Sequence, residues 1–457
     1  MVEDKENIQF ELTDELIEKV ELLVSNAEDK KLKSLLNEFH FADVAEILDE
    51  LDLDDSVYVI KLLDSETTAD ILTELDEDTR EKVLENLSAK EIAEEVEELD
   101  TDDAADIISE LPEERQAEVI SRIEDDEHRE EITELLAYDE DTAGGLMAKE
   151  LVKVYETWTV AGCLRRIRGQ AAEVTRVHSI YVVNKEEKLI GRLSLKDLIV
   201  AKSEQKIADI AKDNVDWVNV NDDVEDVAKV MSKYDLEAIP VVDNNQKLLG
   251  RITIDDIVDV LKEEAEKDYQ MAAGITGDVE ADDSILELTR ARLPWLFLGL
   301  VGGVGAFIIM YFFEENLPKE AIILFLFTPL IAAMAGNVGV QSSAIIVQGL
   351  ANDDVKGSIN SRLIKEMLLA TLNGFILSLF LFLFVFAWEQ DFKLALAISI
   401  SLVAVIIIAG LIGTFIPLFL DKRGIDPAIA TGPFITTSND ILGILIYFWI
   451  AKLILGI

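Results

Sequence analysis

The sequence predicts a multidomain membrane protein with three parts: an all-α, solenoid-like N-terminal domain, an α/β module made of two copies of one motif, and an α-helical bundle of five transmembrane helices. Three observations predict this fold class. Apolar residues recur every twelve positions between about 38 and 137, a second motif returns after 59 residues, and five long apolar runs follow residue 284. We therefore expect a soluble part followed by a membrane part.

Charge divides the chain at the same place. The 457 residues include 41 basic and 90 acidic side chains, for a net charge of -49. Residues 284–457 hold only 10 of these basic and 12 of these acidic side chains, which leaves 31 and 78 in the first 283 residues. So acidic a part repels nucleic acid and anionic lipid and attracts cations. Most of these charges are expected to form a solvated surface, and only clusters with ligand-like spacing indicate binding.

The ends and the cysteine content give further expectations. Cys163 is the only cysteine, which excludes an intrachain disulfide and a thiolate metal cluster. The N-terminus "MVEDKENIQF" has neither the basic nor the apolar region of a signal peptide. We therefore expect the first 283 residues to lie in the cytoplasm.

The twelve-residue repeat predicts short stacked helices over residues 1–137. The repeated position is apolar in every copy: Leu51, Leu63, Leu75, Leu87, Leu99, Leu111 and Ile123. The next position suits a helix start in every copy: Asp52, Asp64, Asp76, Ser88, Asp100, Pro112 and Glu124. Helices repeated in this way bury their apolar faces against their neighbours.

The second repeat pairs "SIYVVNKEEKLIGRLSLKDLI" (179–199) with "AIPVVDNNQKLLGRITIDDIV" (238–258). It resembles a tandem pair of CBS domains, here residues 138–203 and 204–260, and this resemblance implies adenine nucleotide binding. The positions that match the nucleotide-contacting residues of that family are Ser194, Asp197, Thr253 and Asp256. The same spacing also fits a helix capping box, and both roles can hold together.

Residues 261–285 are expected to form an acidic connecting helix and a linker, and residues 286–457 the transmembrane domain. The apolar runs lie at 293–313, 321–348, 364–388, 394–420 and 428–456, each long enough to cross a bilayer. With the N-terminus inside, seven basic residues fall at cytoplasmic ends: Arg290, Arg292, Lys356, Arg362, Lys365, Lys422 and Arg423. Lys319, Lys393 and Lys452 fall outside, so the positive-inside rule supports this orientation and an external C-terminus.

Polar residues gather in the second and fifth runs. The candidate pore and ion-binding residues are Asn337, Gln341, Thr436, Thr437, Asn439 and Asp440. We treat Asp440 as the only acid of the spans, and we expect Pro329 and the Gly432–Pro433 pair to break the helices and free backbone carbonyls. Such oxygen ligands suit a hard cation such as Mg²⁺, passing mostly hydrated, and a symmetric dimer would double the single carboxylate. A monovalent-cation or proton path would need equally few acids.

Almost the whole chain from residue 38 onward resembles the MgtE-type magnesium transporters. The motifs that carry the resemblance are "AYDEDTAGGLM", "RLPWL", "GNVGVQS" and "GIDPAIATGPFITTSND". The resemblance implies a homodimeric Mg²⁺-selective channel of the inner or plasma membrane, with Asp440 as the pore carboxylate and with closure driven by cytoplasmic Mg²⁺. It also implies a set of regulatory Mg²⁺ ligands: Asp70, Asp102, Asp106, Asp223, Glu225, Asp235, Asp256, Asp259, Glu264, Asp268 and Asp426.

Two departures from that family and three rival functions complete the prediction. Val340 replaces an amide of the second-span motif, and Lys267 stands where the connecting helix of the family carries an acid. Transport of another divalent ion such as Co²⁺ or Mn²⁺ stays open, because oxygen ligands alone do not separate these ions. An intramembrane aspartyl enzyme needs two facing carboxylates, and we count only Asp440 in the spans, so we do not expect an enzyme. A tethered sensor would have no use for polar residues at membrane depth, so the polar second and fifth runs argue against that function.

Overall fold

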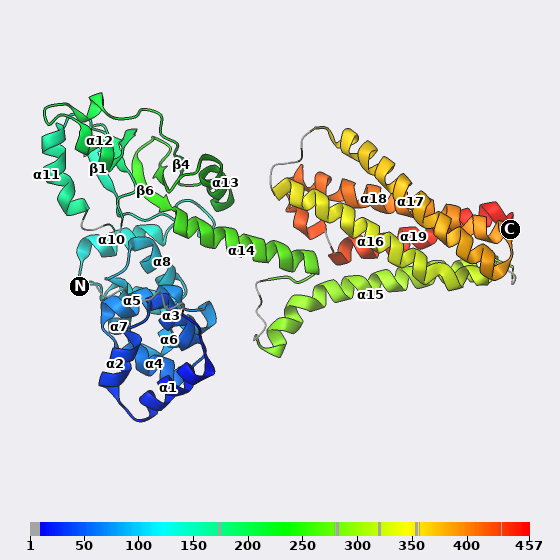
Figure 1. The fold of residues 1–457 in the computed structure, drawn as a ribbon, viewed down its shortest axis with the longest axis horizontal. Coiled ribbons are helices and arrows are strands. Elements are labelled where there is room, and N and C mark those ends of the chain that lie inside the picture. Colours follow the sequence, from blue (N-terminus) through cyan, green and yellow to red (C-terminus); the bar gives the residue numbers. More distant parts are fainter. Residues whose placement is uncertain are drawn as a thin grey trace, which may run out of the picture. The chain divides into compact units, whose positions relative to one another are not determined.

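A computed structural model describes residues 10–171, 174, 176–277, 279, 283–318, 321–351, 355, 357–430 and 432–457. Lys319 and Lys356, which entered the orientation prediction, lie outside the described residues. The chain forms two compact units, and the boundary between them in the sequence falls between Leu261 and Lys262. Figure 1 labels the elements of both, and each unit is described by itself.

The first unit begins with ten short helices. Their bounds are α1 (Asp14–Ser25), α2 (Asp29–Leu36), α3 (Phe41–Asp49), α4 (Leu53–Leu62), α5 (Ser65–Glu74), α6 (Glu77–Asn86), α7 (Ala89–Val96), α8 (Thr101–Ser109), α9 (Glu113–Ile120) and α10 (Asp126–Leu135). The helices α4 to α9 begin at twelve-residue intervals, each directly after the predicted capping position. The all-α prediction is thereby confirmed.

Packing between alternate helices explains the twelve-residue period. Helix α3 packs on α5, α4 on α6, α5 on α7, and α7 on α9, so each helix meets a neighbour two repeats along. The repeated leucine ends each helix and turns inward, as Leu75 and Leu87 do with 3% exposure each. A half-buried ion pair between Arg80 and Glu110 ties α6 to the residue that follows α8.

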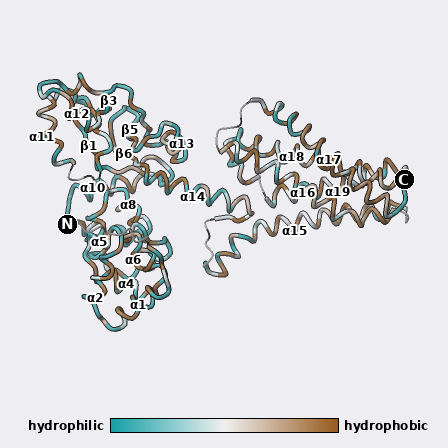
Figure 2. Tube along the Cα trace, in the orientation of Figure 1, coloured by the Kyte–Doolittle hydropathy of each residue, from teal (hydrophilic) through white to brown (hydrophobic). Residues whose placement is uncertain are grey.

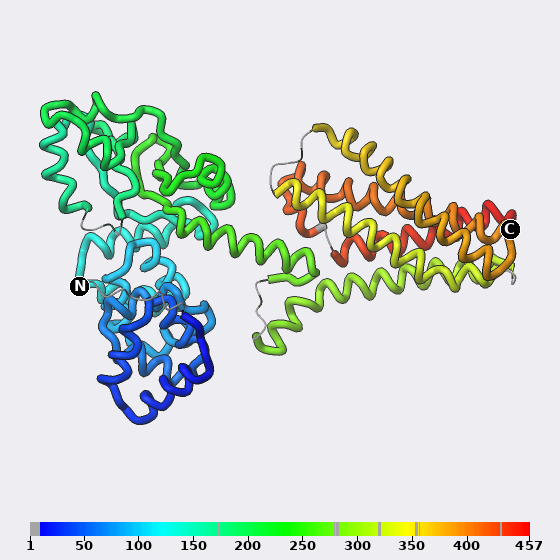
Figure 3. Tube along the Cα trace, in the orientation of Figure 1, coloured from blue at the N-terminus to red at the C-terminus, as the bar shows by residue number. Residues whose placement is uncertain are grey.

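Two three-stranded sheets follow, coloured cyan to green along the chain in Figure 3. The first contains β1 (Val152–Tyr155), β2 (Ile180–Val183) and β3 (Leu189–Leu193), and the second β4 (Val218–Asn219), β5 (Ala238–Val242) and β6 (Leu248–Thr253). In each sheet the first pair is parallel and the second antiparallel. The register shifts between Val182 and Val183 and again between Val241 and Val242, at equivalent positions of the repeat.

Helices accompany the two sheets. They are α11 (Val160–Gln170), α12 (Leu195–Val200), the short η1 (Ile207–Asp209), α13 (Val224–Tyr234) and the start of α14 (Ile254–Ala273). Cys163 is buried in the core of the first copy.

The segment after α10 joins the helical domain to the second sheet. The backbone N–H of Gly144 donates to the carbonyl of Val220 at 2.9 Å, and Ala148 bridges to Arg251 of β6. A Cβ on Gly250 would lie 2.6 Å from the carbonyl oxygen of Ala148, so only glycine allows the two backbones to approach so closely. This junction holds α8 next to the second CBS copy.

Among the described residues of the second unit, five helices are long and apolar enough to cross a membrane: α15 (Ile285–Asn316), α16 (Ile323–Ala351), α17 (Ile359–Glu389), α18 (Phe392–Asp421) and α19 (Gly432–Leu455). They carry most of the brown, hydrophobic trace in Figure 2. Helix α18 is the most buried and packs against α16, α17 and α19. A short turn, η3 (Pro427–Ala430), precedes α19.

The predicted break in the second span is wrong, because helix α16 continues through Pro329 to Ala351. In the fifth run, 428–456, η3 ends at Ala430, and α19 begins at Gly432, which has φ +42°, and Pro433, so the run is interrupted at the predicted pair. Backbone groups in a bilayer have no water to bond, so a helix is retained wherever the loss of one bond can be tolerated. The polar groups of α16 are therefore side chains rather than the freed carbonyls of a broken helix.

The close approach of α16 and α18 gives a test of this packing. A Cβ on Gly413 would lie 2.3 Å from the carbonyl oxygen of Gly339, whereas a Cβ on Gly303 meets nothing within 4 Å. We expect Gly413→Ala to destabilise the second unit by about 1–3 kcal/mol through overpacking. The matched control Gly303→Ala should melt like the unmodified protein. Thermal unfolding in detergent measures both, and equal melting temperatures would contradict the packing described here.

Candidate ion-binding site

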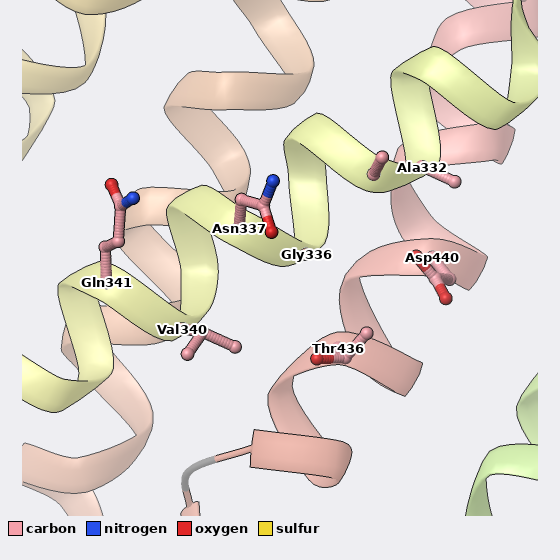
Figure 4. A pocket seen from close by; sticks show the side chains of 8 residues that line it. Ala332, Gly336, Asn337, Val340, Gln341, Thr436 and Asp440 are labelled. Carbon is pink, nitrogen blue, oxygen red and sulfur yellow. The ribbon is translucent and has the colours of Figure 1, made fainter.

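Four of the six predicted pore residues line one cavity between α16 and α19. This α16–α19 cavity has a volume of about 460 Å³ and is lined by Ala332, Ala333, Gly336, Asn337, Val340, Gln341, Thr436 and Asp440. Figure 4 shows Asn337 and Gln341 on α16 and Thr436 and Asp440 on α19. The wall offers one carboxylate, two amides and one hydroxyl, with Val340 as the apolar residue that the sequence pointed out.

Asp440 also lines a second, larger cavity. This α15–α19 cavity, of about 720 Å³, is lined by Ala273, Gly274, Ile275, Arg292, Trp295, Leu296, Gly299, Pro433, Thr436, Thr437 and Asp440. Asp440 and Thr436 therefore face both spaces. Among the residues that the structure describes, the half-buried Asp440 carboxylate has no hydrogen-bond or ion-pair partner, so it can accept a hydrated cation.

Asn439 does not line either cavity, contrary to the prediction. Asn439 is 1% exposed and is not among the residues that line the two cavities. Its side-chain nitrogen lies 1.8 Å from the position that a Cβ on Gly339 would occupy. Neither amide atom of Asn439 finds a hydrogen-bond partner within the described part of the chain. The reason is helical geometry, because neighbouring residues of a helix point about 100° apart, so Asp440 and Asn439 face different surroundings.

Asp440 is not the only acid of the spans, and this assumption is corrected. Glu366 lies in the second turn of α17, inside the third apolar run, and its carboxylate accepts a hydrogen bond from the Ser342 hydroxyl of α16 at 2.7 Å. Glu366 stands near the start of the run and next to Lys365, so the sequence alone indicates a charge that flanks the span. The signal was the acid itself, because an acid within a span is rarely there without a function.

The end of α14 contacts the start of α19 within the second unit. A Cβ on Gly274 would lie 2.4 Å from Cγ of Pro433, and a Cβ on Gly432 would lie 2.4 Å from the carbonyl oxygen of Ala272. Gly274 has φ +78°, a conformation that a side chain would strain. The indole N–H of Trp295 donates to the hydroxyl oxygen of Thr276 at 2.6 Å, and this bond ties the segment that follows α14 to α15.

A second acidic site lies in the first unit, where α8 meets the second CBS copy. Oxygens of Asp100, Asp102 and Glu150 lie within 4.8 Å of one another, and Asp102 is only 9% exposed. Arg251 partly offsets this charge, because its guanidinium donates to Asp100 at 3.3 Å. Together with Asp103, Asp106 and Asp256, these carboxylates form what we call the α8 acidic cluster. Close carboxylates with a buried member fit a divalent cation.

The pKa values of the α8 acidic cluster express its unfavourable charge. Burial, followed by the neighbouring Asp103 and Asp256 carboxylates, raises the pKa of Asp102 well above its usual value. Burial and the charge of Asp256 raise the pKa of Asp103 to about 7. Burial and the charge of Glu150 raise the pKa of Asp100 to about 6, although Arg251 acts in the opposite direction. Each shift indicates a carboxylate that lacks sufficient positive charge nearby.

The cluster unites three of the predicted regulatory ligands and adds three residues that the sequence did not identify as ligands, namely Asp100, Asp103 and Glu150. Asp102 and Asp106 each interact electrostatically with Asp256. Asp100 was interpreted only as a helix cap, yet its side chain makes no cap bond and pairs with Arg251 instead. Glu150 stands alone before a strand, and no sequence pattern marks it.

The other predicted regulatory ligands are dispersed. Asp223 and Asp235 stand at opposite ends of α13, about 18 Å apart along its axis, and Glu225 pairs with Lys229. Asp70 is exposed on α5, and Asp426 accepts the backbone N–H of Ala428 at 2.8 Å. Asp259, Glu264 and Asp268 all lie on α14.

The Lys267 departure has a structural consequence. Its ammonium lies 3.2 Å from the Glu264 carboxylate, one turn earlier on α14. A lysine thus neutralises one of the predicted ligands.

The candidate nucleotide residues fall into two different environments. Ser194 lines a cavity of about 310 Å³ with His178, Ser179, Arg192, Leu193, Lys212, Tyr234, Asp235, Leu236, Glu237 and Ala238. Asp197 forms a capping box with Ser194 and lies 3.9 Å from Lys212. In the second copy Asp256 accepts the Thr253 hydroxyl at 2.7 Å, but it also belongs to the α8 acidic cluster, which repels phosphate. The cavity at Ser194 therefore combines two basic side chains, Arg192 and Lys212, with two acids, Asp235 and Glu237, whereas the surroundings of Asp256 favour a cation.

Five membrane-length helices with an acid-bearing polar cavity, joined to a strongly acidic soluble part, define a multi-pass membrane protein built to meet hydrated cations. Family profiles agree: the divalent cation transporter family MgtE matches residues 328–450, the MgtE intracellular N domain 39–141, and the CBS domain 143–204 and 207–263. The chain belongs to the MgtE family.

Relatives cover most of the chain. It is 39% identical over 324 residues to the magnesium transporter MgtE of Enterococcus faecalis, which spans 71% of each protein. It is 34% identical to the magnesium transporter MgtE of Thermus thermophilus, over 71% of this chain and 72% of the relative. The solved cytosolic domain of the Mg²⁺ channel MgtE in complex with ATP superposes with a TM-score of 0.50 at 34% identity, covering 53% of this chain and 99% of that domain.

The raised pKa values of the α8 acidic cluster predict a pH-dependent stability. Raised carboxylate pKa values mean that the folded state holds protons that the unfolded state releases, so stability falls as pH rises through about 6 to 7. We expect the melting temperature of a soluble fragment, residues 1–274, to fall between pH 5.5 and about 8 without divalent ions. Saturating Mg²⁺ should remove most of this slope.

A matched pair of variants locates the effect. Asp103→Asn should raise the melting temperature at about pH 8 by roughly 2–4 °C, because one repelling charge is removed. Glu113→Gln, an exposed acid on α9, should leave it unchanged. Equal effects of the two variants would show that the general charge of the fragment, rather than the cluster, sets the slope.

Proposed function

We propose that this protein is a Mg²⁺-selective channel or transporter of the cytoplasmic membrane, gated by cytoplasmic Mg²⁺. The observation that carries the proposal is the α16–α19 cavity of about 460 Å³, which Asp440, Asn337 and Gln341 line together. The names of the relatives, which are magnesium transporters, point to the same cargo.

The ligand chemistry supports a hydrated hard cation. Mg²⁺ loses its water reluctantly and binds proteins through one or two carboxylates plus water-mediated contacts. One carboxylate with amide and hydroxyl neighbours provides this arrangement. Sulfur and imidazole ligands, which select Zn²⁺ or Cu⁺, are absent from the residues that line the cavity.

Two copies of the chain would complete the path. Asp440 is half-buried, and a second Asp440 related by a two-fold axis would give the divalent ion a matching charge. Much of α15 is also uncovered in one chain, where only 17% of its most apolar window is buried. We therefore propose a homodimer with the N-terminal unit in the cytoplasm and a short external C-terminus.

Feedback from cytoplasmic Mg²⁺ would act through the acidic residues. Without divalent ions the carboxylates of the α8 acidic cluster repel one another, and bound Mg²⁺ would relieve that repulsion and favour the packed arrangement of α8 on the second CBS copy. Helix α14 ends against Gly432 and Pro433 at the start of α19, and Ala273 and Gly274 line the same cavity as Asp440. A change in the position of α14 would therefore reach the pore carboxylate.

The central test replaces the pore carboxylate. Asp440→Asn keeps the size of the side chain but removes its charge, so we expect Mg²⁺ uptake in a transport-deficient host to fall by about tenfold or more. Asp421→Asn, an exposed acid at the end of α18, is the matched control and should retain uptake. Retained uptake in Asp440→Asn would exclude Asp440 from the path.

Competition separates Mg²⁺ from the other divalent ions. In proteoliposomes, Mg²⁺ flux should persist in the presence of equimolar Co²⁺ or Mn²⁺, because a site that holds the hydrated ion discriminates by its hydration shell. Strong inhibition with matching Co²⁺ or Mn²⁺ flux would assign the protein to those ions instead.

The cavity lined by both CBS copies favours a second function, the binding of ATP as a regulator. Arg192 and Lys212 offer positive charge around a space of about 310 Å³ whose wall also includes Asp235 and Glu237, and Tyr234 offers an aromatic face. A solved relative whose cytosolic domain is in complex with ATP supports this assignment.

ATP binding is tested on the cavity wall. Lys212→Ala should weaken ATP binding by about tenfold, because one charge facing the phosphates is lost. Lys206→Ala, an exposed lysine that does not line the cavity, should bind normally. Equilibrium dialysis with labelled ATP measures both. Unchanged binding in Lys212→Ala would place the nucleotide elsewhere.

A further inference from the structure

Helix α16 has two distinct faces. One face lines the α16–α19 cavity and includes Asn337 and Gln341. The other is buried against the helix bundle: Leu324, Thr328, Ile331, Ala335, Gly339, Ser342, Ser343 and Ile346. The assignment of side chains to the two faces depends on the rotation of α16 about its own axis.

The carboxylate of Glu366 contacts the buried face. It accepts the Ser342 hydroxyl at 2.7 Å, and Ser342 is 6% exposed. Ser342 directly follows Gln341, which faces the cavity. Because successive helix residues point about 100° apart, holding Ser342 against α17 directs Gln341 toward the cavity.

A third helix closes this contact. The Oε1 atom of Glu366 lies 2.8 Å from the place where a Cβ on Gly410 of α18 would stand. Glycine thus leaves the room in which the carboxylate reaches between α17 and α18 to α16. Three transmembrane helices meet at one acidic side chain.

An acid in this place needs a reason to be there. Placing a charged side chain within a span costs free energy, whereas an apolar residue at position 366 would pack without that cost. Apolar contacts between membrane helices are weakly directional, and a hydrogen bond fixes one rotation of the helix. Ser342 on its own could bond to its own helix backbone, so the carboxylate supplies a partner on another helix.

We propose that Glu366 is a positioning residue for ion conduction: its hydrogen bond to Ser342 sets the rotation of α16, so that Asn337 and Gln341 face the ion together with Asp440. This inference rests on the proposed function for its transport readout. Glu366 itself does not touch the ion, because it lines neither of the two cavities that contain Asp440.

The first experiment measures Mg²⁺ uptake by variants of the full chain. Glu366→Ala and Ser342→Ala should each lower the uptake rate by about tenfold, and the double variant should be no slower than Glu366→Ala, because both remove one bond. Glu366→Gln keeps an acceptor oxygen and should stay within about twofold of the unmodified rate. Thr371→Ala, an exposed α17 residue that bonds its own helix, is the control and should be unaffected.

Several outcomes would overturn the proposal. Full uptake by Glu366→Ala would remove its role. Loss of uptake by Glu366→Gln as severe as that of Glu366→Ala would show that the negative charge, rather than the hydrogen bond, is required. Additive losses in the double variant would show that Ser342 and Glu366 act separately. Ser342→Ala, the smaller change, keeps the uptake test available if Glu366→Ala does not fold.

The second experiment reads the rotation of α16 without any transport. Cys163, the single natural cysteine, is replaced by serine, and a cysteine is placed at Asn337, Gln341 or Ile346. A small charged methanethiosulfonate should label the first two positions, which line the cavity, and spare Ile346, which is 7% exposed. With Glu366→Ala added, labelling at 341 should fall and labelling at 346 should rise, each by several-fold, whereas Glu366→Gln should preserve the original pattern.

The two experiments keep the two hypotheses apart. If Asp440→Asn still takes up Mg²⁺ while Glu366→Ala shifts the labelling, the proposed pore fails and the positioning role stands. If Asp440→Asn is inactive while labelling is the same with and without Glu366→Ala, the pore stands and the positioning role is overturned.

Discussion

The close packing of α16 on α18 is the constraint on which the membrane part depends. Gly413 allows α18 to approach the carbonyl of Gly339, and Asn439 of α19 lies against the same glycine. With this face of α16 buried, its amide side chains at 337 and 341 have to face the α16–α19 cavity. Tight packing and the polar lining of the cavity therefore depend on each other. Because small residues bury one face of α16 against its neighbours, the polar residues on its other face are directed toward the cavity.

Electrostatic repulsion has the corresponding role in the soluble part. Apolar contacts hold the helices α4 to α9 together. These contacts do not constrain the acidic faces of the helices, which can therefore vary from one helix to the next. At α8 these faces converge on Asp256 and Glu150 of neighbouring elements, where Arg251 supplies only part of the compensating charge. The fold thus stores an electrostatic cost at one junction, and a divalent cation relieves such a cost more effectively than a screening salt does.

Periodicity made the architecture predictable, whereas contacts between distant segments did not follow from it. The twelve-residue spacing placed the helix starts from Leu53 to Glu113, and the second repeat predicted both sheets, because local propensity and burial determine such elements. The position of Asp440 on the cavity was also predicted. The burial of Asn439, the pairing of Asp100 with Arg251 and the bond between Glu366 and Ser342 each depend on which face meets which neighbour. Neither sequence spacing nor composition determines that choice.

Asp440 and Glu366 show how one residue class can serve two purposes in membrane-length helices. Asp440 faces open space and has no protein partner among the described residues, so its charge is available to a mobile ion. Glu366 is partly buried where three helices meet and has the Ser342 hydroxyl as its partner, so its interaction is directed at the protein. A carboxylate that must release its ion needs weak, replaceable contacts, whereas one that orients a helix needs a fixed contact. The difference in partners, rather than in residue type, therefore separates the ion ligand from the positioning residue.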